Sequence, residues 1–206
     1  MKLTDIPVIF ICPDHNEKYN ERKEHMFTLL HKIGFKHVNM FKSGKGEFPA
    51  CVAKDTCEIL SSRIDDQPFI LLEDDVELTE WANLDMGFDI PENTDAFYLG
   101  FSRLGASYIY NSNNGYDSVE IKHLDDRYIK IINMLGTHAI LYLSKKFKTV
   151  VYDLMKSSIT TGIISDVNIA RIQKDYNIFA YKYPFFYQSE NLGNNYWAKN
   201  VTNIRF

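Results

Sequence analysis

The chain has 206 residues, 45% of them hydrophobic and 24% charged, and a formal net charge of -4. This length predicts one domain with a sizeable core, and this composition is that of a globular protein. The negative charge argues against a protein that binds nucleic acid by neutralising phosphates, and no apolar run is long enough to span a membrane.

Three cysteines, Cys12, Cys51 and Cys57, lie in apolar or helical surroundings. An odd number in such surroundings predicts reduced, buried side chains rather than a disulfide framework, and hence a cytoplasmic protein. The apolar stretch 8–12 is too short for a signal peptide and is followed by Pro13. The abrupt end at Phe206 leaves open whether the chain is one domain of a longer protein.

The first half of the chain alternates between strand and helix patterns. Strands are expected at 6–12, 37–41 and 69–72, and helices at 18–33 and 50–64, with Gly34 as the stop of the first helix. Strand, helix, strand, helix, strand is the order of a parallel, right-handed α/β unit.

The second half is less regular. We expect a strand at 96–101, a hairpin or mobile loop at 107–121, apolar segments at 131–135 and 139–143, helices at 145–156 and 166–174, and a strand at 178–186. Ser144 is a candidate helix cap, and Pro184 predicts that the last strand ends in an edge or loop. The loop 107–121 has a polar, turn-rich tip, so we expect it to order when a substrate binds.

An acidic cluster follows the third strand directly. Glu73, Asp74 and Asp75 come after four apolar residues, and Glu77 lies two positions further on. Along an extended chain Glu73, Asp75 and Glu77 would point one way and Asp74 the other. Such like charges at a strand end favour a hard divalent cation, Mn²⁺ or Mg²⁺, at the edge where α/β proteins bind ligands. The alternative is a solvated acidic turn that leads into a helix.

Four places in the chain together resemble one family. They are Asn16, Asn20 and Arg22 after the first strand, the helix at 47–60, the acidic motif LLEDDV at 71–76, and the pair THAIL at 137–141 and SDV at 165–167. They resemble the GT-A fold of nucleotide-sugar glycosyltransferases over residues 6–189. The similarity is to the lipooligosaccharide and collagen galactosyltransferase family and to glycosyltransferase domains of large DNA viruses such as chlorella viruses.

The resemblance implies an α/β fold with a mixed, mainly parallel central sheet flanked by helices on both sides. It implies a single domain, with residues 1–101 binding the nucleotide sugar and residues 102–206 binding the acceptor. The implied reaction moves a sugar from a UDP- or GDP-sugar to a glycan or glycoprotein acceptor with Mn²⁺ or Mg²⁺. For a viral protein the expected compartment is the host cytoplasm.

The resemblance also assigns donor-binding residues in the first half. Asp75 is the metal ligand by motif position, with Asp74 as a second candidate, and Glu73 or Asp74 contacts the ribose or a metal-bound water. Pro13, Asp14 and His15 end the first strand, where the base and ribose lie in this fold. A cation there stabilises charge on the departing nucleoside diphosphate.

Two basic residues of the first half, Arg22 and Lys54, are candidates to pair with phosphate. The alternative for both is a solvated charge on a helix.

Two residues of the second half are candidate catalytic groups. Asp166 follows a small, Gly-containing loop and opens an apolar helix, so we assign it as the acceptor-side base of an inverting reaction, with His138 close to it. The alternative for Asp166 is a helix cap, and the next candidate base is Glu190. The third metal ligand is His138, Asp166 or water, or else His138 is a hydrogen-bonded core residue.

Aromatic residues near the end form a candidate acceptor platform, half of which should be core: Tyr181, Tyr183, Phe185, Phe186, Tyr187 and Trp197. Two other functions stay open from the sequence. One is a metal-dependent phosphodiesterase or nuclease, for which an acidic strand end is equally apt. The other is a sugar-nucleotide-binding module without turnover.

Overall fold

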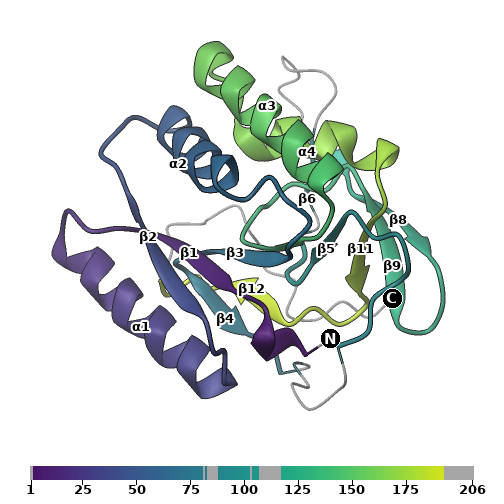
Figure 1. The fold of residues 1–206 in the computed structure, drawn as a ribbon, viewed down its shortest axis with the longest axis horizontal. Coiled ribbons are helices and arrows are strands. Elements are labelled where there is room, and N and C mark those ends of the chain that lie inside the picture. Colours follow the sequence, from purple (N-terminus) through teal and green to yellow (C-terminus); the bar gives the residue numbers. More distant parts are fainter. Residues whose placement is uncertain (1, 81, 83–87, 103, 107–116, 193–206) are drawn as a thin grey trace.

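The computed structural model describes residues 2–80, 82, 88–102, 104–106 and 117–192, arranged around one eight-stranded sheet (Figure 1). The first half contains η1 (Leu3–Asp5), β1 (Val8–Pro13), α1 (Glu17–Ile33), β2 (Val38–Ser43), α2 (Ala50–Ser61), β3 (Phe69–Glu73), β4 (Val76–Leu78) and β5 (Ala96–Tyr98). The second half contains β6 (Leu104–Gly105), β7 (Asp117–Ser118), β8 (Glu120–His123), β9 (Tyr128–Ile132), β10 (Ala139–Tyr142), α3 (Lys145–Thr161), α4 (Ser165–Ile172), η2 (Gln173–Asp175), β11 (Ile178–Tyr181) and β12 (Phe186–Gln188).

The central sheet is mixed, with strand order β2-β1-β3-β10-β5-β11-β9-β8. β1 pairs in parallel with β2 and β3, while β10 enters antiparallel between β3 and β5. β9 is also antiparallel to its neighbours, and the remaining strands share one direction. The predicted α/β class with a mixed, mainly parallel sheet is confirmed.

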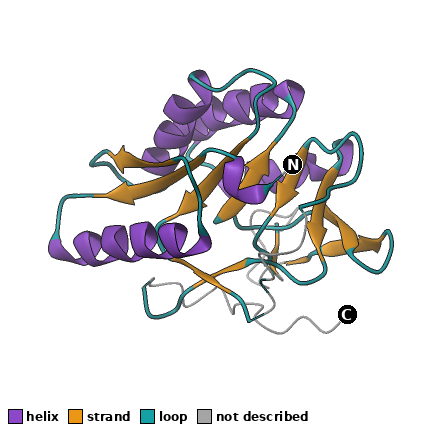
Figure 2. Cartoon of the chain, turned by 60° about the horizontal axis from the view of Figure 1, so that its bottom comes forward, coloured by secondary structure: helices purple, strands orange, loops and turns teal. Residues whose placement is uncertain are grey.

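Helices cover both faces of this sheet (Figure 2). α1 packs its apolar stripe on one face, and α2, α3 and α4 pack on the other. β3 is buried between them, with Ile70 and Leu72 in one core and Phe69 and Leu71 in the other. Full burial of such side chains stabilises the fold by about 1.5–3 kcal/mol each, so β3 is firmly fixed and its carboxyl end is a rigid support.

The helix ends follow local capping rules. Ser144 accepts a hydrogen bond from the amide of Phe147 at 3.1 Å, and α3 ends at Gly162, whose φ is 72°. α1 ends in the same way at Gly34, with φ 91°. Both the Gly34 stop and the Ser144 cap are confirmed. α3 is longer than expected because no residue before Gly162 takes the left-handed conformation that ends it.

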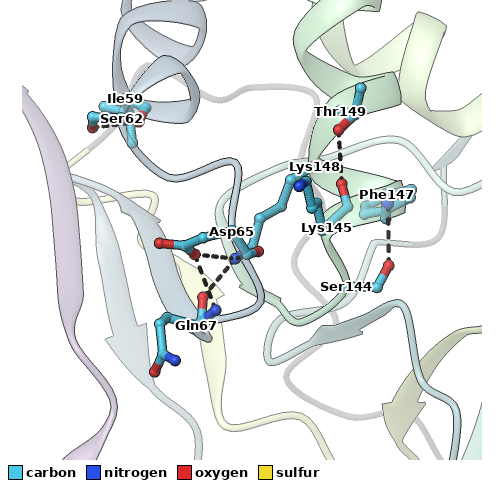
Figure 3. A network of polar contacts seen from close by, with 9 residues as sticks. All are labelled: Ile59, Ser62, Asp65, Gln67, Ser144, Lys145, Phe147, Lys148 and Thr149. Carbon is cyan, nitrogen blue, oxygen red and sulfur yellow. Dashed lines mark hydrogen bonds and ion pairs between the residues drawn. The ribbon is translucent and has the colours of Figure 1, made fainter.

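A buried lysine joins α3 to the loop before β3 (Figure 3). The Lys148 side chain has no exposed surface, and its amine donates to the Asp65 carbonyl at 2.9 Å, the Asp65 carboxylate at 3.3 Å and the Gln67 carbonyl. These three acceptors match the three donors of an ammonium group. Lys148 therefore fixes the start of β3 from the helix that covers it.

The acidic segment differs from both expectations. β3 ends at Glu73, the chain turns at Asp74 and Asp75, and it continues as β4, which pairs with β12 in a small sheet. The continuous extended strand through Glu77 is therefore wrong, and so is the helix of the alternative interpretation. Glu77 bonds instead to Tyr187 and, at 3.0 Å, to the Ser189 hydroxyl.

The strand expected at 178–186 is two strands in two sheets. β11 ends at Tyr181, and β12 begins at Phe186 after the segment that contains Pro184. The predicted break at Pro184 is confirmed, and the Pro184 carbonyl accepts a bond from the Thr79 hydroxyl at 2.6 Å. The break sends β12 across to β4, so it brings Gln188 to the acidic turn.

Most of the expected hairpin at 107–121, including its tip at 111–115, lies outside the described residues. β7 and β8 contain the second arm of this hairpin.

Among the helices that the structure describes, none is long and apolar enough to cross a membrane.

Candidate active site

Two carboxylates meet at the carboxyl end of β3. The Gln188 side-chain nitrogen donates to Glu73 Oε2 at 2.8 Å and lies 3.5 Å from Asp75 Oδ1. The Thr137 hydroxyl donates to Glu73 Oε1 at 2.9 Å. The Glu73–Asp75 pair is thus held by groups from β12 and from the loop before β10.

The surroundings of this pair disfavour two negative charges. Burial raises the pKa of Glu73 to about 8, and the charges of Asp75, Asp166 and Asp74 act in the same direction. Burial also raises the pKa of Asp75, with Asp74 adding to the effect and Arg22 opposing it. Such a pair gains stability from a shared proton or from a cation.

Asp74 points away from the pair and is neutralised within the protein. Its Oδ1 atom lies 2.8 Å from Arg22 Nη1, and both side chains are about nine-tenths buried. The expectation that Asp74 opposes Glu73 and Asp75 is met, although a turn and not strand alternation produces it. The solvated-charge alternative for Arg22 is wrong, because only 9% of the residue is exposed.

The end of β1 lies beside these acids. In the register of the parallel pair Ile11 is opposite Glu73, so Pro13, Asp14 and His15 continue past the acidic strand end. Asp14 forms an ion pair with Lys42 at the end of β2, which lowers the pKa of Asp14. The centres of the His15 and Tyr19 rings lie 4.9 Å apart.

A pocket of about 560 Å³ opens next to the end of β2. Its lining comes from β2, the following loop, α2 and the end of α3, and comprises Phe41, Lys42, Gly44, Lys45, Gly46, Glu47, Ala50, Cys51, Lys54, Asp55, Glu58 and Ile159. Lys54 therefore lines a pocket, whereas the acidic cluster lies at the end of another strand. The pocket belongs to the same carboxyl edge, because β2 runs parallel to β1 and β3.

Asp166 reaches this edge from the second half. Its Oδ2 atom accepts a bond from the Gly136 amide at 3.3 Å, and its buried Oδ1 atom has no hydrogen-bond partner among the described residues. Burial raises its pKa, and its charge contributes to the raised pKa of Glu73. The helix-cap alternative is wrong, because the cap position of α4 is Ile164.

His138 lies on the other side of Gly136. The residue is 3% exposed, and neither ring nitrogen has a hydrogen-bond partner among the described residues. Burial lowers its pKa to about 4, so the imidazole is neutral at physiological pH. A Cβ atom at Gly100 would lie 2.0 Å from Nε2, so only glycine fits beneath the ring. His138 is a core residue, but not the hydrogen-bonded one of the alternative.

The residues of the candidate aromatic platform are divided between the core and the surface, as expected. Tyr181, Phe185 and Phe186 are buried in the core, whereas Tyr183 is 53% exposed and Tyr187 is half-buried. Trp197 lies outside the described residues. Glu190, the second candidate base, is exposed in the turn after β12.

The sulfur chemistry is that of free thiols. All three cysteines are unpaired to one another, with Cys12 buried and Cys51 and Cys57 partly buried. Burial and the neighbouring Asp74 raise the pKa of Cys12 to about 12, so it stays a thiol.

The oxygen-bearing side chains beside β3 suit a hard cation that takes few ligands from the protein. Within the described residues no group of three or more His, Cys, Asp and Glu side chains is placed to hold a metal ion. Two carboxylates and an amide do converge, at Glu73, Asp75 and Gln188. Mg²⁺ and Mn²⁺ sites of this kind use one or two carboxylates and fill the rest of the shell with water and phosphate oxygens.

Sequence reasoning missed three residues here: Thr137 as a partner of Glu73, Gln188 as a partner of the pair, and Gln173 beneath the loop that carries Thr137. Gln188 had no signal of its own, because it lies in an aromatic segment. Its position depends on how β12 leaves the main sheet.

Comparison with known proteins gives similarity in fold but not in sequence. No protein-family model matches the chain, and no curated protein matches it in sequence. Among solved structures, it is similar to a glycosyltransferase involved in the glycosylation of the major capsid of PBCV-1. That match has 10% sequence identity and a TM-score of 0.42 and covers 85% of this chain and 92% of the other.

Proposed function

We propose that this protein is a metal-dependent glycosyltransferase of the GT-A type, which moves a sugar from a nucleotide sugar to a hydroxyl of a glycan or glycoprotein. The observation that carries the proposal is the Glu73–Asp75 pair at the end of β3. The loop of Gly136 and Thr137 connects it to Asp166 through hydrogen bonds of 3.3 and 2.9 Å. Donor-side acids and an acceptor-side carboxylate then lie at one edge of the sheet, where α/β proteins bind ligands.

Glu73 and Asp75 are the residues that would hold Mn²⁺ or Mg²⁺. The Gln188 amide already contacts both, and a half-turn of that amide presents its oxygen in place of its nitrogen. A bound cation would stabilise the negative charge that develops on the departing nucleoside diphosphate. We assign Asp74 to Arg22 rather than to the cation, because its Oδ1 atom is already paired.

The nucleotide end of the donor would lie across the end of β1 and towards the pocket beside β2. Pro13, Asp14 and His15 form the floor of this path, and Lys42, Lys45 and Lys54 border the pocket. Lysine is a common partner of phosphate and other anionic groups. The volume of about 560 Å³ lies in the range of small-molecule sites.

Asp166 would deprotonate the acceptor hydroxyl if the reaction inverts the anomeric centre. Its raised pKa makes it a stronger base than an exposed aspartate. Its Oδ1 atom is buried without a hydrogen-bond partner among the described residues, and an acceptor hydroxyl that reached it would supply one. The neutral imidazole of His138 is buried beside Gly136, so it would act on the acceptor side through this loop and not by direct contact with the substrate.

A panel of UDP- and GDP-sugars with Mn²⁺ tests the proposal, read by thermal shift and by release of free nucleotide. We expect selective stabilisation by one donor class and release of UDP or GDP. Selective binding without release would indicate a binding module, and phosphodiester cleavage without donor binding would indicate a nuclease or phosphodiesterase. Glu77→Gln is the matched control for Asp75→Asn, because Glu77 lies in the same segment but bonds to Tyr187 and Ser189.

A further inference from the structure

One fully buried amide holds the loop between β9 and β10. Gln173 in η2 is 0% exposed, and its Oε1 atom accepts a bond from the Met134 amide at 2.7 Å. Its Nε2 atom donates to the Met134 carbonyl at 2.9 Å and to the Tyr98 hydroxyl at 3.1 Å. The side chain thus binds both backbone groups of Met134, as a neighbouring strand would.

The held loop has an unusual backbone. Asn133 has φ 62° and Gly136 has φ 101°. A left-handed conformation at a residue other than glycine is uncommon and costs free energy. The loop therefore needs outside contacts to keep this shape, and the bonds to Met134 lie between these two residues.

The same loop connects Asp166 to the acidic pair. Its Gly136 amide donates to Asp166 Oδ2 at 3.3 Å, and its Thr137 hydroxyl donates to Glu73 Oε1 at 2.9 Å. Asp166 opens α4, and Gln173 follows the end of α4 directly. One helix and its extension therefore contact the loop at two points, and the loop in turn contacts Glu73.

We propose that Gln173 is a positioning residue for sugar transfer: it fixes Met134 so that the loop holds Gly136 on Asp166 and Thr137 on Glu73. This role rests on the proposed function for its effect on the reaction, but the fixing of the loop does not. Without Gln173 the loop keeps its bonds to Leu104 and Ala106 but loses those on the side of α4. Asp166 and Glu73 are then less firmly held relative to each other. A misplacement of this kind acts on the transfer step rather than on donor binding.

The test compares two buried side-chain amides, one within α4 and one directly after it. Gln173→Met keeps much of the side-chain volume and removes all three hydrogen bonds. The control is Asn168→Leu, because Asn168 is also buried in the same segment but donates to the Ser158 hydroxyl on α3 at 2.8 Å. Both variants lose buried hydrogen bonds, whereas Gln173→Met alone releases the loop.

Two readouts are measured at the same number of degrees below each Tm. Amide hydrogen exchange at Met134 and Gly136 should accelerate at least ~10-fold in Gln173→Met and stay near wild type in Asn168→Leu. Under the proposed function, kcat should fall at least ~10-fold in Gln173→Met while the KM for the donor changes less than about 3-fold. If Gln173→Met does not fold, Tyr98→Phe removes only the third bond and should raise exchange at Met134 by a smaller factor.

Unchanged exchange at Met134 and Gly136 in Gln173→Met, or in Tyr98→Phe where it has to replace that variant, overturns the proposal. So does a loss of kcat in Gln173→Met no larger than that in Asn168→Leu. If the wild-type protein transfers no sugar from any donor, the proposed function is wrong, and the exchange measurement still decides whether Gln173 fixes the loop.

Discussion

Arg22 Nη1 lies 2.8 Å from Asp74 Oδ1, and this buried ion pair divides the acidic motif into two parts. Asp74 is neutralised from α1, whereas Glu73 and Asp75 face the opposite side with the Gln188 amide between them. With Asp74 paired to Arg22, Glu73 and Asp75 are the two carboxylates that we propose as cation ligands. The positive charge of Arg22 also lowers the pKa of Asp75, against the effect of burial.

Arg22→Met should lower the free energy of unfolding by about 3–5 kcal/mol, because it leaves Asp74 buried without its partner. Denaturation in urea measures this value. The double variant Arg22→Met with Asp74→Leu should recover most of the loss, since it removes both charges. Lys23→Met, which changes a partly exposed neighbour on α1, is the control. An Arg22→Met protein as stable as that control would contradict the account of a buried pair.

Gln188→Ala should weaken Mn²⁺ binding by roughly 10- to 100-fold, the range seen when polar groups around metal sites are removed. Mn²⁺ electron paramagnetic resonance measures the free and bound ion without any substrate. Tyr187→Phe is the control, because Tyr187 adjoins Gln188 on β12 but donates to Glu77. Equal Mn²⁺ affinity in Gln188→Ala and Tyr187→Phe would show that the amide is not part of the cation site.

Much of the fold was predictable because its signals are local. The buried strands, the Gly34 stop and the Ser144 cap depend on neighbours in sequence. The pairing of Gln188 with the acids depends on a strand break and on which sheet β12 joins, and no local pattern encodes that choice. The same applies to Lys148, whose spacing on α3 reads as an ordinary helix charge but whose amine is enclosed by the loop before β3.

The acidic residues of the candidate site could be predicted from the sequence, but their hydrogen-bond partners could not. Asp75 stands out because it follows an apolar strand, and Asp166 because it follows a small, Gly-containing loop and opens an apolar helix. The turn at Asp74 and Asp75 could not be distinguished from a longer strand, because alternation and a tight turn give the same facing pattern over three residues.

Asp166→Asn should spare donor binding and reduce transfer to an authentic acceptor, since it removes a proton acceptor and keeps the shape of the side chain. Calorimetry with the donor and steady-state transfer rates measure the two effects separately. Glu190→Gln, in an exposed turn, is the control. Near-wild-type transfer in Asp166→Asn would rule out this assignment and leave Glu190, or a retaining reaction without such a base, as the next hypothesis.

The buried imidazole of His138 should make stability depend on pH. Its pKa is about 4 in the folded protein against 6.5 for an unperturbed histidine, so the unfolded chain binds the proton more tightly. The stabilisation is therefore full above pH 6.5 and is lost as the pH falls towards 4, by roughly 3 kcal/mol in total. Urea denaturation of wild type and of His138→Asn over this pH range measures this loss. Carboxylates titrate in both proteins, so the difference between the two curves belongs to His138. Parallel curves for the two proteins would contradict the burial of a neutral His138.

The central claim is that the Glu73–Asp75 pair binds the donor through a divalent cation. Calorimetric titration of the preferred nucleotide sugar, with Mn²⁺ and then with a chelator, tests it most directly. We predict that binding needs Mn²⁺, that Asp75→Asn lowers turnover at least ~10²-fold with the fold intact, and that Glu77→Gln behaves as wild type. Undiminished donor affinity in the chelator, or in Asp75→Asn with Mn²⁺ present, would contradict the claim.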